Sequence, residues 1–160
     1  MTPAAKKARI ESLRNLVENY GRQGKGRDPI CMEALEELSR LEHGGLDFQK
    51  SLLAIRAAAK QRKFLSYKDI ADINGLSWNA ARRPLDRHLY ELMDYCNRHG
   101  WPLLPAIVVH KDNVATGMKN ESGLLGFARG AQELGIDPGS NLLRFLRDEQ
   151  ERVFSWAAEV

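Results

Sequence analysis

The sequence predicts a mainly α-helical fold with a small β component, built as a winged helix-turn-helix with an N-terminal helical hairpin. Two observations predict it. Apolar residues recur at helical spacing through most of the 160 residues. Between Phe64 and Val109, a capped short helix, a tight turn, a second helix and a β-branched run follow one another, which is the element order of a winged helix-turn-helix.

The N-terminal part, residues 1–46, is predicted to be a hairpin of two helices. Thr2 precedes a proline at the first helical position, and Asp28 does the same for the second helix. Gly44-Gly45 is expected to end the second helix. This helix carries an apolar stripe, which is made of Met32, Leu35, Leu38 and Leu41. An isolated hairpin is marginal in water, so the stripe must pack on the rest of the chain, on a protein partner or in a homodimer.

Charge is distributed in blocks, although the net charge is only +3. Residues 1–27 carry seven basic and two acidic side chains, whereas residues 28–47 carry six acidic and one basic. Residues 48–63 are basic again. Basic blocks of this kind favour a surface that faces phosphates. The alternative is that charges of both signs only solvate the helices.

The second part, residues 47–160, is predicted to be a winged-helix-like domain with C-terminal helices. Asp47 caps a helix that runs to about Arg62. Leu103–Val109 is rich in β-branched residues and is predicted to be one strand. Two further helices are expected around a turn at residues 137–139.

The helix-turn-helix opens this domain. Ser66 caps a short helix, and Asn74-Gly75 forms the turn because both residues tolerate positive φ. The next helix begins after Ser77, and Pro84 removes one of its backbone donors and should kink or split it. The segment Trp78–His88 is therefore predicted to be a recognition helix.

Polar side chains gather at the start of this second helix. Asn79, Arg82 and Arg83 lie within about 100–120° of one another on a helical surface, allowing for the kink. Arginine reads guanine edges or binds phosphate, and asparagine reads adenine. Trp78 is expected in the core, with stacking on an unpaired base as the alternative.

The loop at residues 111–123 follows the predicted strand and is either a wing whose lysines reach phosphate or a plain connector. The residues predicted to bind nucleic acid are Tyr67, Lys68, Ser77, Trp78, Asn79, Arg82, Arg83, Arg87, Lys111 and Lys119.

The segments SYKDIADINGLSWNAARRPLDRHL and WPLLPAIVV resemble the winged-helix half of the alkyltransferase and alkyltransferase-like DNA-repair proteins. The matching positions are Tyr67, Ile70, Ala71, Gly75, Ala81, Arg82 and Pro102. The resemblance implies that Arg82 helps to turn a target nucleotide out of the duplex and that Tyr67 lies near the backbone phosphate. The family's Pro-Cys-His-Arg active-site run is absent, so alkyl transfer is not expected.

No other motif predicts a reaction, a metal or a cofactor. Cys96 and His99 have a C-x-x-H spacing, but no second closely spaced pair completes a zinc site. The acidic residues form no recognisable catalytic set, and the glycine-rich loop at residues 21–27 lacks the spacing of a phosphate-binding loop. The sequence therefore predicts no catalytic residues.

Composition is typical of a soluble globular protein, with 43% hydrophobic and 28% charged residues. No apolar run approaches the ~20 residues that cross a bilayer, and residues 1–13 lack the apolar core of a secretory signal, so no membrane contact is expected. Two cysteines, Cys31 and Cys96, are too few for a disulfide scaffold and favour the reducing cytoplasm.

These observations together predict a non-enzymatic protein that binds nucleic acid, with duplex DNA favoured, through Trp78–His88. One alternative is a protein-interaction adaptor or an inhibitor encoded by a mobile element, in which the arginines meet an acidic protein surface. Another is an enzyme that processes a DNA base in a pocket that the sequence does not reveal.

Overall fold

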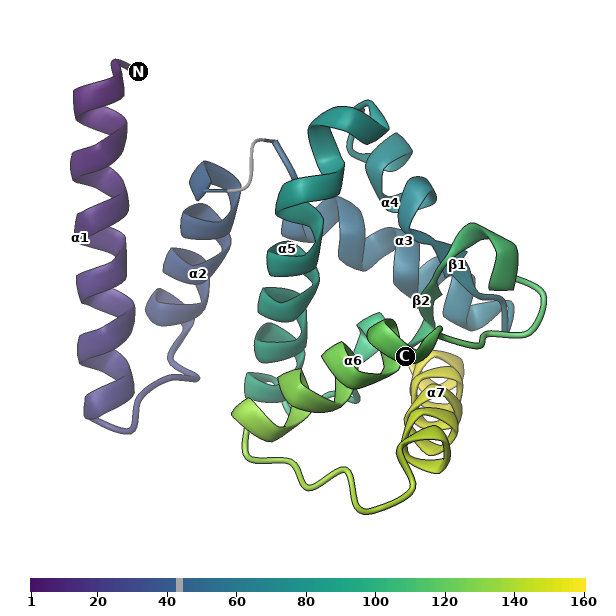
Figure 1. Ribbon diagram of the computed structural model, residues 1–160. Coiled ribbons are helices and arrows are strands. Elements are labelled where there is room, and N and C mark those ends of the chain that lie inside the picture. Colours follow the sequence, from purple (N-terminus) through teal and green to yellow (C-terminus); the bar gives the residue numbers. More distant parts are fainter. Residues whose placement is uncertain (43–44) are drawn as a thin grey trace.

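The computed structural model describes residues 1–42 and 45–160, and most of them are helical (Figure 1). The helices are α1 (Pro3–Arg22), α2 (Pro29–Glu42), α3 (Phe48–Lys60), α4 (Tyr67–Ile73), α5 (Trp78–Arg98), α6 (Glu121–Glu133) and α7 (Leu142–Glu159). Two 3-10 turns, η1 (Leu104–Ile107) and η2 (Lys111–Asn113), and two short strands, β1 (Leu65–Ser66) and β2 (Val108–Val109), complete the described elements. The predicted mainly α fold with a small β component is confirmed.

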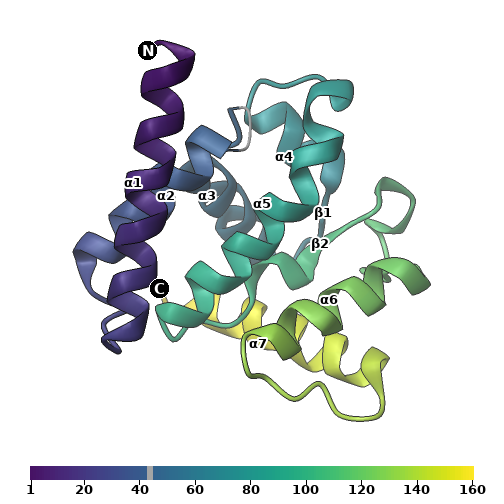
Figure 2. The ribbon, with the colours of Figure 1, turned by 60° about the vertical axis from the view of Figure 1, so that its left-hand side comes forward.

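Helices α1 and α2 form an antiparallel hairpin at one side of the molecule, with α1 outermost (Figures 1 and 2). Their apolar seam is narrow, since Leu13 of α1 is buried against Ala34 and Leu38 of α2. Ion pairs bridge the two helices beside the seam, with Arg9 on Glu37 and Arg14 on Glu42. The basic and acidic blocks of the N-terminal sequence therefore partly neutralise each other.

The apolar stripe of α2 is divided between two neighbours. Met32 belongs to the main core and Leu35 packs against it, whereas Leu38 and Leu41 pack on the α1 side. The stripe is thus covered within the chain, as one of the predicted arrangements requires. The helix ends at Glu42, and the predicted stop at Gly44 lies outside the described residues.

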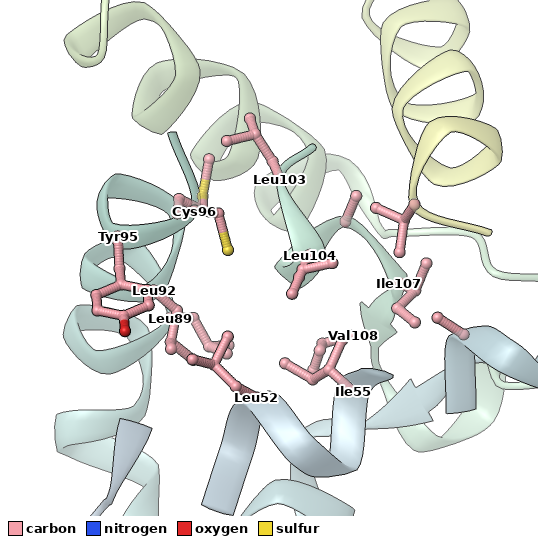
Figure 3. Packing of buried hydrophobic residues seen from close by; sticks show 14 of the residues in the cluster. Leu52, Ile55, Leu89, Leu92, Tyr95, Cys96, Leu103, Leu104, Ile107 and Val108 are labelled. Atoms are coloured by element: carbon pink, nitrogen blue, oxygen red, sulfur yellow. The ribbon is translucent and has the colours of Figure 1, made fainter. Parts of the chain in front are cut away.

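The main core lies between α3, α5, η1 and α7, and Figure 3 shows its centre. Leu92 of α5 and Ile55 of α3 are fully buried there, and they lie in the same cluster as Leu104 and Ile107. Burial on all sides, rather than on one face, explains why the apolar run after residue 102 shows no alternation.

The prediction of one strand over Leu103–Val109 is wrong. Pro105 lies in the first turn of η1, where its fixed φ suits a helical turn and its missing N–H is not needed. Within this run only Val108–Val109 forms a strand, β2, which pairs in parallel with β1, with Leu65 opposite Val108. No third strand follows β2 in residues 110–160, where the chain enters η2 and then α6. The predicted order of a short helix, a turn and a longer helix is present as α4 and α5, but the structure does not confirm a winged helix.

Candidate nucleic-acid interface

Side-chain caps mark the starts of α4 and α5, the two helices that flank the turn. Ser66 and Asp69 form a reciprocal capping box at the start of α4, with both hydrogen bonds 2.9 Å long. Gly75 has a φ of +72°, which glycine adopts without steric cost. The Ser77 hydroxyl accepts a hydrogen bond from the Ala80 N–H at 3.2 Å, so this predicted binding residue caps α5.

Asn74 lies at the predicted turn but does not adopt a positive φ. Its φ is −82°, so only Gly75 of the turn pair uses the left-handed region. The Asn74 amide is buried and bonds three partners: its Oδ1 accepts from the Asp47 N–H at 2.8 Å, and its Nδ2 donates to the Ile70 carbonyl and to Ser51 Oγ. Asn74 therefore ties the turn to the start of α3.

The same network reaches α5 through a buried histidine. Ser51 Oγ lies 2.8 Å from Nε2 of His88, and the His88 ring also packs against Phe48. His88, the predicted end of the recognition segment, is therefore an internal residue. Pro84 does not split α5, which continues from Trp78 to Arg98. The turn before α5, at Asn74, and the third turn of α5, at His88, are thus both bonded to Ser51 of α3.

Four side chains at the start of α5 are exposed. Asn79, Arg82 and Arg83 make no ion pair or side-chain hydrogen bond with the part of the chain that the structure describes. Trp78 is 43% exposed, so the prediction that it lies in the core is wrong. It occupies the first helical position, one turn before Ala81, the first buried residue of α5, and the core does not extend that far.

Other charges near this surface are already engaged. Lys68 pairs with Asp72 and Arg87 pairs with Glu91, each at 3.1 Å within its own helix. Asp86 follows Arg82 by one turn and is exposed. The unbalanced positive charge of α5 is therefore limited to its first two turns.

Two predicted binding residues point inward. The Lys119 ammonium donates to the Val108 carbonyl and lies 5.7 Å from the centre of the Tyr67 ring. Burial lowers the pKa of Lys119 to about 8. Burial, and secondarily Asp86, raise the pKa of Tyr67. The expectation that Lys119 reaches outward to phosphate is therefore corrected, whereas Lys111 is exposed.

The cysteine and histidine residues considered as metal ligands have separate packing roles. Burial raises the pKa of the Cys96 thiol to about 12. His99 stacks on Trp101, with ring centres 4.3 Å apart. Within residues 1–42 and 45–160, no group of three or more His, Cys, Asp or Glu side chains could hold a metal ion.

No protein-family model, curated protein or solved structure matches the chain. None of the helices in the described ranges has the length and apolar character to cross a membrane. The structure brings Trp78, Asn79, Arg82 and Arg83 together at one end of α5, and separates them from Lys119. Sequence reasoning missed the buried network beneath them.

Proposed function

We propose that this chain is a non-enzymatic nucleic-acid-binding protein that holds duplex DNA against the start of α5. The observation that carries the proposal is the pair Arg82 and Arg83, which are exposed and have no acidic partner among the described residues. An unpaired arginine fork is suited to phosphate oxygens or to the N7 and O6 atoms of guanine. Asn79 on the same surface has the donor and acceptor that adenine requires.

The support beneath these side chains strengthens the proposal. A recognition helix must keep its position while charged side chains are desolvated against DNA. The Asn74, Ser51 and His88 network fixes the turn and α5 relative to α3. A buried polar network requires every polar group to find a hydrogen-bond partner, because an unpaired buried group destabilises the fold. A helix that was only solvated would not need such a network.

The test is DNA binding by the double variant R82A/R83A. The double variant should bind a fluorescein-labelled duplex several-fold to a hundredfold more weakly in fluorescence anisotropy, because a good arginine contact contributes ~1–3 kcal/mol. In a salt titration, the slope of log affinity against log salt should also fall by about 2. The affinities for a single DNA strand and for an RNA hairpin of the same length should be measured beside that for the duplex, to show which nucleic acid is preferred.

The matched control is K6A/K7A, which removes the same charge from exposed positions on α1. Equal weakening by the two variants would indicate attraction to net charge rather than an interface on α5. A folded R82A/R83A variant with unchanged affinity would overturn the proposal.

One observation favours the alternative of a protein-interaction module. Ile73 and Trp78 are each 43% exposed at neighbouring ends of α4 and α5, and such apolar groups suit a protein partner. Binding that does not change with salt would support this alternative. We also propose a cytoplasmic location. The free, buried thiols of Cys31 and Cys96 suit a reducing compartment.

A further inference from the structure

A cavity of about 350 Å³ lies between α4, α5, α6 and the loop that precedes α6. Its walls are mainly apolar, and they include Leu89, Met93 and Phe127. Gly126 lies on the α6 side, and a Cβ built there would meet no atom within 4 Å. The volume is within the range of pockets that enclose small organic molecules.

Lys119 is the one lysine or arginine in the lining of this cavity. Its ammonium donates to the Val108 carbonyl and lies over the rings of Tyr67 and Phe127, at 5.7 and 5.6 Å from their centres. No carboxylate of the described residues pairs with it. An ammonium has three donors, and a long flexible stem normally lets it reach water.

The chain around Lys119 holds it in place. The Gln150 side chain donates to the Gly117 carbonyl at 2.8 Å, and Arg147 donates to the Thr116 carbonyl at 2.8 Å. Gly117 lies directly against the Phe64 ring, where a Cβ would come within 2.2 Å of a ring carbon. Side chains of α7 thus hold the loop that carries Lys119 in place. The inward direction of the Lys119 side chain is therefore a property of the fold.

The other titratable groups facing the cavity come from α4 and α5. Tyr67 keeps its proton because burial and Asp86 raise its pKa. Tyr90 also keeps its proton, because burial and the neighbouring Glu133 raise its pKa to about 12. Asp86 is the one carboxylate of the lining, and it is exposed. The cavity therefore combines one cation and hydroxyl groups with an apolar body.

We propose that this cavity is a binding site for a small aromatic carboxylate. The carboxylate pairs with the Lys119 ammonium, and the aromatic ring lies against Met93 and Phe127. This site differs from the proposed nucleic-acid surface, because its cation points inward whereas Arg82 and Arg83 are exposed; Asp86 borders both. The Asp86 carboxylate repels the ligand carboxylate and therefore weakens its binding.

A pH dependence follows from the pairing. A bound carboxylate stabilises the charged form of Lys119 and raises its pKa above the value of about 8 in the free protein. Binding therefore takes up a proton when the pH is near or above that value. Affinity should be constant below this range and should fall as the pH rises through it.

The experiment is calorimetric titration of the full chain with benzoate between pH 6.5 and 9.5. Benzyl alcohol is the matched neutral probe, and at pH 8 two buffers of different ionisation enthalpy report the proton uptake. Benzoate should bind with millimolar or better affinity, on the order of the weakest small-ligand sites. It should bind more tightly than benzyl alcohol, and only benzoate should weaken at high pH.

Two variants should move the affinity in opposite directions. K119M keeps most of the stem and removes the charge, so it should weaken benzoate binding about tenfold or more. D86N removes the opposing carboxylate and should tighten benzoate binding by roughly twofold to fivefold. The control K60M removes an exposed lysine of α3 and should change neither probe.

Three results would each overturn the site: no benzoate binding to the unmodified chain, equal binding of benzyl alcohol, or unchanged benzoate affinity in K119M. If K119M does not fold, the pH profile of the unmodified chain and the direction of the D86N change decide the question. Since DNA is absent from all of these titrations, their result does not depend on the nucleic-acid proposal.

Discussion

The N-terminal hairpin and the body of the molecule are stabilised in different ways. The body, residues 45–160, surrounds a continuous core that includes Ile55, Leu92 and Ile107, each fully buried. The hairpin seam has a much smaller buried cluster, in which Leu13 is the only α1 member. Ion pairs between exposed arginines of α1 and partly buried glutamates of α2 complete the contact of the two helices.

This difference indicates that the two regions should open separately. Exposed ion pairs contribute little to stability in water, and a narrow seam removes little apolar surface from solvent. Helix α1 should therefore detach at a free energy well below that of global unfolding. Helix α2 should stay with the body, since Met32 lies in the main core and Glu36 accepts a hydrogen bond from the Tyr95 hydroxyl at 2.6 Å.

The largest expected effect is the loss of a core side chain in the body. Leu92→Ala should destabilise the protein by about 2–5 kcal/mol, because the removed methyl groups leave a cavity between packed helices. Urea unfolding followed by circular dichroism measures the change. The signal of the body helices should shift as one transition, separate from any earlier loss of α1. A split of that main transition would contradict a single cooperative body.

The next effect concerns the polar network in the same body. Asn74→Ala leaves the Asp47 N–H, the Ile70 carbonyl and Ser51 with lost partners, which should cost about 1–3 kcal/mol. Asn15 is exposed on α1, so Asn15→Ala is the matched control and should change the midpoint of unfolding very little. If the two variants melt at the same temperature, Asn74 is not a structural support of the turn.

The sequence predicted most helices, because caps and apolar spacing are local signals. Ser66 with Asp69 and Ser77 mark the starts of α4 and α5 as expected. The run after Pro102 was misassigned because a short, fully buried apolar segment has no periodicity that separates a strand from a 3-10 turn.

The candidate sites were less predictable than the helices. Asn79, Arg82 and Arg83 are exposed as expected, because their spacing on α5 follows from the sequence alone. The direction of Lys119 depends on Gln150 and Arg147, which are about thirty residues further along the chain. Trp78 was placed wrongly because apolar character does not reveal where the core ends. The direction of the Lys119 side chain therefore depends on long-range contacts, which the local sequence does not show.

A smaller and local effect is expected in the hairpin. Leu13→Ala should detach α1 more often, because Leu13 fills the seam against Ala34 and Leu38. The amides of α1 should lose hydrogen-exchange protection, whereas those of α5 should keep it. The midpoint of body unfolding should change much less than in Leu92→Ala. Equal loss of protection in both helices would show that hairpin and body unfold as one unit.

The smallest expected effect is the pH dependence of the α1 contact. The Arg9 guanidinium, through its hydrogen bonds at 2.7 and 2.8 Å, lowers the pKa of Glu37 below its ordinary 4.5. A lowered folded-state pKa contributes stability that is fully present above the ordinary value and is lost as the pH falls toward the lowered one. Protection of the α1 amides, corrected for intrinsic exchange rates, should therefore decrease modestly below about pH 4.5.

The variant Arg9→Gln separates this pair from other acid effects. It should abolish most of the pH dependence in α1 while leaving that of the body unchanged, since Glu37 then titrates near its ordinary value. High salt should imitate the variant, because Arg9 is exposed and Glu37 is partly exposed, so that salt screens their attraction. A pH response of α1 that persists in Arg9→Gln would assign it to other carboxylates, of which Glu42 beside Arg14 is the first to test.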